Sequence, residues 1–125
     1  MDTRTQSALT AEATLDVERA LQFLGGDADV LRELLHTFML EAPAELATFE
    51  AAIAGSRRET LLRYLHRLVP TLAIIATESL HRQARELYHA MQPPDTTPDG
   101  HLPACLALAQ RMHALHDAIL AQLSR

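Results

Sequence analysis

Histidine is the residue type with the widest chemical potential in this chain of 125 residues, which contains seven of them. A solvent-exposed imidazole is largely neutral near cytoplasmic pH and can act as a nucleophile, a proton carrier or a metal ligand. Surface histidines are also common, so each one has to be judged by its surroundings. The seven are His36, His66, His81, His89, His101, His113 and His116.

His66 differs from the others by its position in a predicted helix over residues 57–76. The apolar stripe of that helix is Leu61, Leu65, Leu68, Leu72 and Ile75. At about 100° per residue, His66 lies roughly 140° from the centre of the stripe, so its imidazole is predicted to face solvent. The same outer face holds Arg63, Arg67 and Pro70.

The neighbours of His66 suit a transferred anionic group. Leu62 and Val69 lie one turn away at the edge of the stripe, and Arg63 and Arg67 lie beside them. An apolar patch with a cationic rim favours docking of a partner helix, followed by charge-assisted contact with a phosphoryl oxygen. The residues around His66 therefore suggest phosphoryl chemistry.

A metal site is the alternative use of these histidines. Three Glu-x-x-His pairs occur, and a di-iron bundle uses two such pairs. Two of the pairs lie off the apolar stripes of their helices, so we do not expect a shared centre inside the bundle, and no metal is predicted. A surface metal on the last helix is a further option, but a solvated face is preferred there. The pairs are Glu33/His36, Glu78/His81 and Glu86/His89, and the last-helix group is His113, His116 and Asp117.

Composition excludes several classes of function. The net charge is −5 and the basic residues form no stripe, so nucleic acid is not an expected partner. The single Cys105 excludes an intrachain disulfide, and we expect it to be a small buried residue. There is no run of about 20 apolar residues, no signal-peptide core and no nucleotide-binding or hydrolase motif. We expect a cytoplasmic chain without membrane contact or a nucleotide site of its own.

The pattern of apolar residues predicts an all-α fold, an up-and-down four-helix bundle with a short N-terminal covering helix. Asp16 can cap the short helix, which Gly25-Gly26 ends, and Asp27 can cap the next. Pro43 should kink or divide that second helix. Residues 1–13 are predicted to be a flexible segment or linker, and 14–125 the bundle. The predicted helices cover 16–24, 29–55, 57–76, 78–91 and about 103–123.

The predicted core is mainly aliphatic, since aromatic residues make up only 4% of the chain. The second helix should bury Leu31, Leu34, Leu35, Phe38, Ala42, Leu46, Phe49 and Ile53. The fourth should bury Leu80, Ala84, Leu87 and Met91. The last should bury Leu106, Leu108, Met112, Leu115, Ile119 and Leu123.

From Leu15 to Met91 the sequence resembles the histidine-containing phosphotransfer (HPt) domain family. The segments that carry the resemblance are LDVERALQFLGGDADVLRELLHTF, PAELATFEAAIAG, LLRYLHRLVPTLAIIATESL and ARELYHAM, in the order of the family. The family's central motif reads Ala-His-x-Leu-Lys-Gly, and its histidine is phosphorylated. The resemblance places His66 at that position and Leu68 at the family's leucine.

This chain departs from the motif at three positions, with Leu65 in place of Ala, Val69 in place of Lys and Pro70 in place of Gly. His-Arg-Leu-Val-Pro is similar to a variant of the family with proline there. Val69 cannot neutralise a phosphoryl group as the lysine does, so Arg63 or Arg67 would have to substitute. Pro70 removes the amide that would bond to the His66 carbonyl, which predicts a kink with a local cost of ~3 kcal/mol.

The resemblance implies a phosphorelay function. His66 would accept a phosphoryl group from a receiver-domain aspartate and pass it to another receiver, with Mg²⁺ supplied by the receivers and no cofactor in this chain. The partners would be response-regulator receivers and a sensor histidine kinase, and the chain either stands alone or is the C-terminal domain of a hybrid kinase. The alternatives are a transfer-silent docking module that uses Leu62 and Val69, and a metal-binding bundle.

Overall fold

The fold of residues 13–125 is described by a computed structural model. Most of the predicted linker, residues 1–12, lies outside the described residues. All the long elements of the described part are helices, which confirms the all-α prediction. They are α2 (Val17–Phe23), α3 (Ala28–Ala54), α4 (Arg58–Ile75), α5 (Glu78–Met91), the 3₁₀ turn η1 (Asp99–His101) and α6 (Leu102–Leu123).

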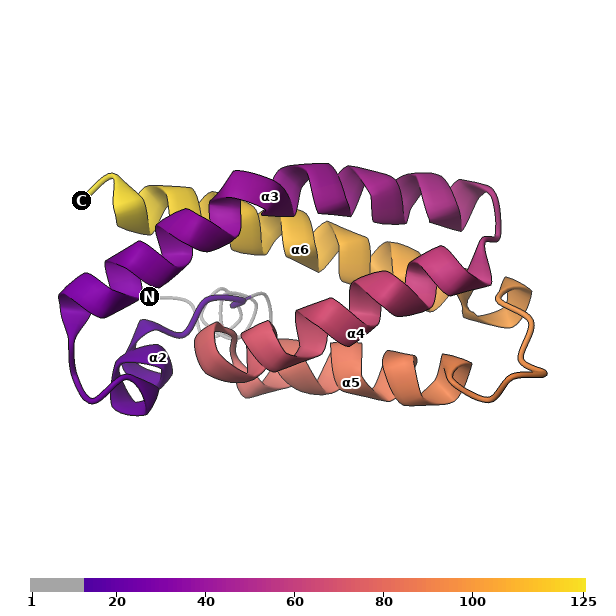
Figure 1. The fold of residues 1–125 in the computed structure, drawn as a ribbon, viewed down its shortest axis with the longest axis horizontal. Coiled ribbons are helices and arrows are strands. Elements are labelled where there is room, and N and C mark those ends of the chain that lie inside the picture. Colours follow the sequence, from indigo (N-terminus) through magenta and orange to yellow (C-terminus); the bar gives the residue numbers. More distant parts are fainter. Residues whose placement is uncertain (1–12) are drawn as a thin grey trace, which may run out of the picture.

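The four long helices form an up-and-down bundle (Figure 1). α3 and α6 lie side by side, α4 and α5 form the other pair, and α3 also packs on α4. The short α2 packs against α4 and α3 at one end of the bundle, as predicted for a covering helix. The described part of the chain contains no helix that is long and apolar enough to cross a membrane.

The predicted caps define the first two helices. Asp16 accepts a hydrogen bond from the amide of Arg19 at 3.0 Å and begins α2. Gly25 and Gly26 follow that helix with φ angles of 72° and 84°, a region that L side chains rarely adopt. Asp27 then accepts from two amides of the first turn of α3. Local side-chain chemistry therefore fixes this tight turn.

The alternative that Pro43 divides the long helix is wrong, because α3 runs unbroken from Ala28 to Ala54. A proline removes one amide donor from the helix, and the remaining turns can hold it together when its apolar face is buried. Ala42 and Leu46, on either side of Pro43, are both buried. The ribbon of α3 changes direction near the middle of its length (Figure 1), as expected for a helix that contains a proline.

The core lies between the four long helices, largely as predicted. The stripes of α4 and α5 are fully within it, while Leu34 and Phe38 of α3 and Leu123 of α6 are partly buried at its edge. The prediction for Leu106 is wrong, because its side chain is 51% exposed. The inward face of α6 keeps the predicted Leu108, Met112, Leu115 and Ile119, and it also contains Cys105 and Ala109.

Cys105 is buried, as expected, and contacts the Met91 sulfur atom at 3.9 Å. Burial raises the pKa of its thiol to about 11. A thiol in this state is a core residue and not a nucleophile.

The chain enters the bundle along the turn between α4 and α5. The Asp16 amide donates to the Ile75 carbonyl at 2.9 Å, and the Thr77 amide donates to the Thr14 carbonyl at 2.8 Å. These bonds flank an antiparallel bridge between Leu15 and Ala76. The entering segment is thus fixed to the end of α4, the helix that carries His66.

The Thr77 side chain connects the entering segment to the first turn of α5, so its removal should destabilise the fold. Its hydroxyl donates to the Ala13 carbonyl at 3.1 Å and accepts from the Leu80 amide at 3.4 Å as the N-cap of α5. We expect Thr77→Ala to lower the free energy of unfolding by about 1 kcal/mol. Urea denaturation would measure the change. Thr77→Ser keeps the hydroxyl and should lose much less; equal losses in both variants would contradict this role.

His116 corrects the predicted solvated face of α6. Its side chain is buried at 7% exposure and packs edge-on against Phe38, with 5.9 Å between ring centroids. Nε2 has no hydrogen-bond partner among the described residues. His113, one turn earlier, does face solvent and pairs with Glu50 at 3.0 Å. The pKa of His116 is lowered mainly by burial and, to a smaller extent, by the nearby His113.

Protonation of His116 should therefore destabilise the bundle. Its folded-state pKa is below the ordinary value of 6.5, so the unfolded chain binds the proton more readily. The stability is complete above about pH 6.5 and decreases as the pH falls from there, by at most about 1.4 kcal/mol per pH unit. We expect His116→Leu to remove this part of the slope in denaturation curves between pH 7.5 and 5. A control, His113→Gln, should keep most of it, because burial is the larger cause of the lowered pKa; an unchanged slope in His116→Leu would refute the assignment.

Candidate functional site

α4 places His66 on the outer surface of the bundle. The predicted stripe of this helix, from Leu61 to Ile75, is buried, whereas His66, Arg63, Arg67 and Pro70 are exposed. The helical period therefore placed the histidine on the correct face. A rigid, packed helix holds the imidazole while leaving it open to a partner protein.

The two apolar neighbours of His66 on α4 are only partly exposed to solvent. Leu62 and Val69 are half-buried and pack against the core. They lie one turn before and one turn after the histidine, so they border it along α4. Their exposed parts can contact a partner, and their buried parts fix the direction of the surrounding side chains.

His66 lies in a shallow hollow of about 280 Å³ between α4 and α5. Its lining residues are Glu59, Leu62, Arg63, His66, Tyr88 and Gln92. Leu62, Arg63 and His66 were predicted from the sequence, and the structure brings these three together. The contribution of α5 was not predicted, because Tyr88 comes from this neighbouring helix and Gln92 directly follows its last residue.

Tyr88 contacts His66 directly. Its hydroxyl lies 3.2 Å from Nδ1 of the imidazole, and the two ring centroids are 5.8 Å apart. Tyr88 follows the buried Leu87 on α5 and is half-buried itself. The period of α5 could have placed Tyr88 at the edge of its apolar stripe, but not opposite His66, since that depends on how α4 and α5 pack.

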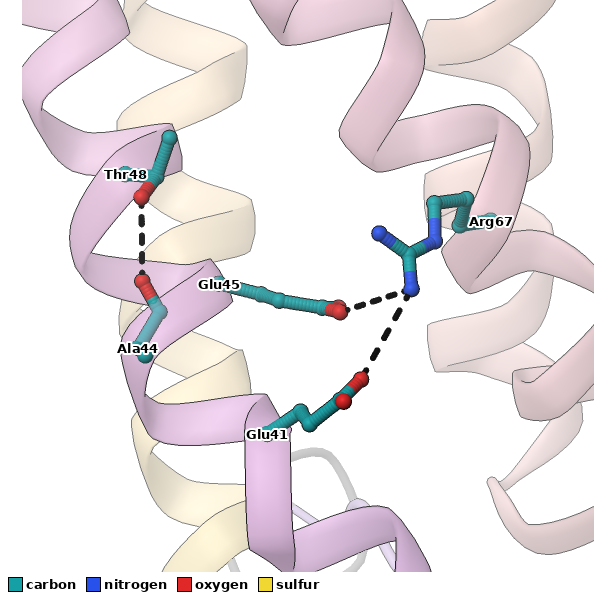
Figure 2. A network of polar contacts seen from close by, with 5 residues as sticks. All are labelled: Glu41, Ala44, Glu45, Thr48 and Arg67. Atoms are coloured by element: carbon teal, nitrogen blue, oxygen red, sulfur yellow. Dashed lines mark hydrogen bonds and ion pairs between the residues drawn. The ribbon is translucent and has the colours of Figure 1, made fainter.

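Arg67 is turned toward α3 (Figure 2), and it does not line the hollow around His66. One of its guanidinium nitrogens lies 2.9 Å from a Glu45 oxygen and 3.8 Å from a Glu41 oxygen. Both carboxylates point at the arginine from α3 (Figure 2). Any phosphoryl group on His66 would have to compete with two negative charges for this cation.

Arg63 is the cation available at the hollow. It lies one turn before His66, and within the described residues it forms no ion pair. It also borders a second hollow between α3 and α4, so its side chain has room on both sides. Of the two arginines predicted to replace the family lysine, Arg63 has the better geometry.

Pro70 leaves α4 continuous, since the helix extends from Arg58 to Ile75. The missing amide leaves the carbonyl of His66 without its usual helical donor. Val69 and Pro70 together make the turn after His66 apolar and uncharged. The predicted kink at this turn stays a prediction.

The Glu-x-x-His pairs do not assemble a metal centre in the part of the chain that the structure describes. Among residues 13–125, no three histidine, cysteine or acidic side chains are placed to hold one ion. His36 and His89 are exposed on different helices, α3 and α5. His81 is half-buried, and its burial, followed by nearby Arg85, lowers its pKa.

Comparison with known proteins identifies the family. The family model described as Hpt domain matches residues 33–122, which is more than half of the chain. The match begins inside α3 and includes α6, so it omits the Gly-Gly turn of the resemblance and adds the last helix. No curated protein matches the chain.

A solved structure shows the same fold. The HPT domain from an Hpt sensor hybrid histidine kinase of Shewanella superposes with a TM-score of 0.78 at 18% sequence identity. The match covers 88% of this chain and 93% of that domain. The family match includes α4 and therefore the exposed His66. The chain therefore belongs to the Hpt domain family and has a role in histidine phosphotransfer in two-component signalling.

Proposed function

We propose that this chain accepts a phosphoryl group from a receiver-domain aspartate onto Nε2 of His66 and passes it to the aspartate of a second receiver. The observation that carries the proposal is the exposed imidazole of His66 at the centre of α4, in a hollow that is also lined by Arg63, which forms no ion pair with residues 13–125. An exposed nucleophile next to a cation, with no nucleotide motif in the sequence, suits a covalent carrier.

The transfer is an in-line displacement at phosphorus. The lone pair of Nε2 forms the nitrogen–phosphorus bond while the bond between phosphorus and the aspartyl oxygen breaks, and its electron pair stays on the carboxylate. Positioning and charge neutralisation supply most of the catalysis in such reactions. Arg63 contributes one positive charge from this chain, and the receiver supplies Mg²⁺ and the rest. The reverse displacement delivers the group to the second receiver.

Docking of the receiver would use the exposed parts of Leu62, Val69 and Pro70. These residues surround His66 along α4 with apolar surface, and apolar surface favours burial against a partner helix. A sensor kinase completes the relay by phosphorylating the first receiver. The proposal places these steps in the cytoplasm.

A silent docking module is the second candidate, and one observation favours it. The turn after His66 contains Val69 and Pro70, where the family motif has lysine and glycine. Without the lysine the transfer loses one charge that stabilises the phosphoryl group, and proline adds bulk where the partner approaches. A module of this kind would still bind receivers through the same surface.

Transfer from radiolabelled phospho-receivers to the purified chain separates the two candidates. We expect label on this protein that is labile in acid and stable in alkali, and its removal by a second, unlabelled receiver. Binding of each receiver is measured in parallel by calorimetry. Receivers that bind in the presence of Mg²⁺ but never transfer the label would favour the silent module.

A further inference from the structure

The backbone carbonyl of His66 lacks its α-helical hydrogen bond. In an α-helix each carbonyl accepts from the amide four residues later, and for His66 that position is Pro70, which has no N–H group. His66 and Pro70 are both exposed, so the carbonyl between them lies on the outer face of α4. The surface on which a receiver is proposed to dock therefore contains a free backbone acceptor.

No side chain replaces the missing amide. Within residues 13–125, no side chain donates to the carbonyl of His66. Arg63 leans away from it, because helical side chains tilt toward the N-terminus of the helix whereas the carbonyls point toward its C-terminus. Arg67 is held on the side of α3 by Glu45, 2.9 Å away (Figure 2). The acceptor is thus left to water or to a partner protein.

The surroundings of this carbonyl favour a cationic donor. Val69 and Pro70 make the adjacent turn uncharged, and the whole chain has a net charge of −5. The positive charge of Arg67 is balanced by Glu41 and Glu45. A lysine or arginine of a partner therefore meets no like charge on this turn, and a hydrogen bond from a charged donor is stronger than one from a neutral donor.

We propose that the carbonyl of His66 is a docking contact that accepts a hydrogen bond from a lysine or arginine side chain of the receiver domain. This inference rests on the docking step of the proposed function, and it applies to the phosphoryl carrier and to the silent module alike. The carbonyl and the imidazole belong to the same residue, so the contact aligns the receiver at the reacting group. Pro70 frees the acceptor, and Val69 leaves the turn open to the charge of the partner.

Pro70→Ala tests the contact, because alanine restores the amide that bonds to the His66 carbonyl. Alanine is also the best helix former, so the variant should remain folded. Purified receiver domains are titrated into each protein with Mg²⁺, and calorimetry gives the Kd. We expect Pro70→Ala to bind a receiver about three- to tenfold more weakly than the wild-type protein. Pro43→Ala, which removes the proline inside α3, is the control and should bind within about twofold of the wild-type protein.

Val69→Lys tests the charge of the donor. A lysine at this position repels a cationic side chain of the receiver, so we expect binding to weaken about three- to tenfold at low salt and to recover largely at about 0.5 M salt, where charges are screened. Val69→Met, which lengthens the side chain without a charge, is the matched control. Equal binding by the two variants at every salt concentration would exclude a cationic donor and overturn the proposal.

The carbonyl carbon of His66 gives a measurement that is independent of affinity and of transfer. Its NMR shift, recorded through the amide of Arg67, should move toward hydrogen-bonded values when a receiver binds the wild-type protein, and should start near them in Pro70→Ala. A shift that does not change on binding, or a Pro70→Ala variant that binds as tightly as the wild-type protein or more tightly, overturns the inference. Receivers that bind without transferring a phosphoryl group contradict the carrier function alone, whereas a panel in which no receiver binds contradicts both.

Discussion

His66→Gln is expected to abolish phosphorylation of this chain by any phospho-receiver. Glutamine preserves the size and polarity of the side chain but has no nucleophilic nitrogen, so the covalent intermediate cannot form. Because His66 is exposed on α4, the substitution should leave the fold intact. The measurement is radiolabel retained on the protein after transfer from a receiver, and the expected result is background.

His89→Gln is the matched control for this experiment. His89 is also exposed and lies on α5 next to Tyr88, with 5.7 Å between their ring centroids. The control should be labelled as fast as the wild-type protein, within about twofold, since surface substitutions away from a site have small effects. Label that persists in His66→Gln and disappears in His89→Gln would move the site to α5.

Arg63→Ala should give the second-largest effect, a decrease of about 10- to 100-fold in the transfer rate. A hydrogen bond to a charged group contributes about 1.5–3 kcal/mol, which corresponds to that range of rates. Arg63 borders the hollow around His66 and has no carboxylate partner among the described residues. The measurement is the rate of labelling by a saturating phospho-receiver.

Arg67→Ala is the matched comparison for Arg63→Ala, because it removes the other arginine near His66. Arg67 is next to His66 in sequence, but its guanidinium is engaged by Glu45 and Glu41. We expect its removal to slow transfer by less than threefold, since an exposed ion pair contributes at most about 1 kcal/mol. If Arg67→Ala is the slower variant, the arginine leaves α3 during transfer and the assignment to Arg63 is wrong.

The fold was largely predictable because its signals are local. Asp16, Asp27 and the two glycines between them determine the first turn through caps and positive φ angles, and these depend on neighbouring residues alone. The helical period then separated buried from exposed residues on α4, which put His66 on the correct face. Helix type, order and approximate ends follow from such patterns.

The errors arose where packing between helices decides the outcome. Leu106 is more apolar than Cys105, yet α6 turns Cys105 inward and leaves Leu106 exposed. His116 is buried because it meets Phe38 of α3, a contact across the bundle that a single helix cannot reveal. Pro43 does not divide α3, since burial of the adjacent turns outweighs one lost amide bond.

The candidate site was predictable where it depends on one helix and unpredictable where it depends on contacts between helices. His66 and its neighbours on α4 follow from the sequence of one helix. The contacts to Tyr88 and Glu45 join residues that are 22 apart in both cases, and each depends on the distance and rotation between two helices. These contacts distinguish Arg63 from Arg67 and bring Tyr88 next to His66, which the sequence alone did not do.

Identification of the phosphorylated residue would show whether His66 is the phosphoryl carrier. The protein labelled by a phospho-receiver is digested at alkaline pH, which preserves phosphohistidine, and the peptides are sequenced by tandem mass spectrometry. We predict the phosphoryl group on His66 and on no other residue. A phosphoryl group on any of the other six histidines, or label confined to an acid-stable serine or threonine, would contradict it.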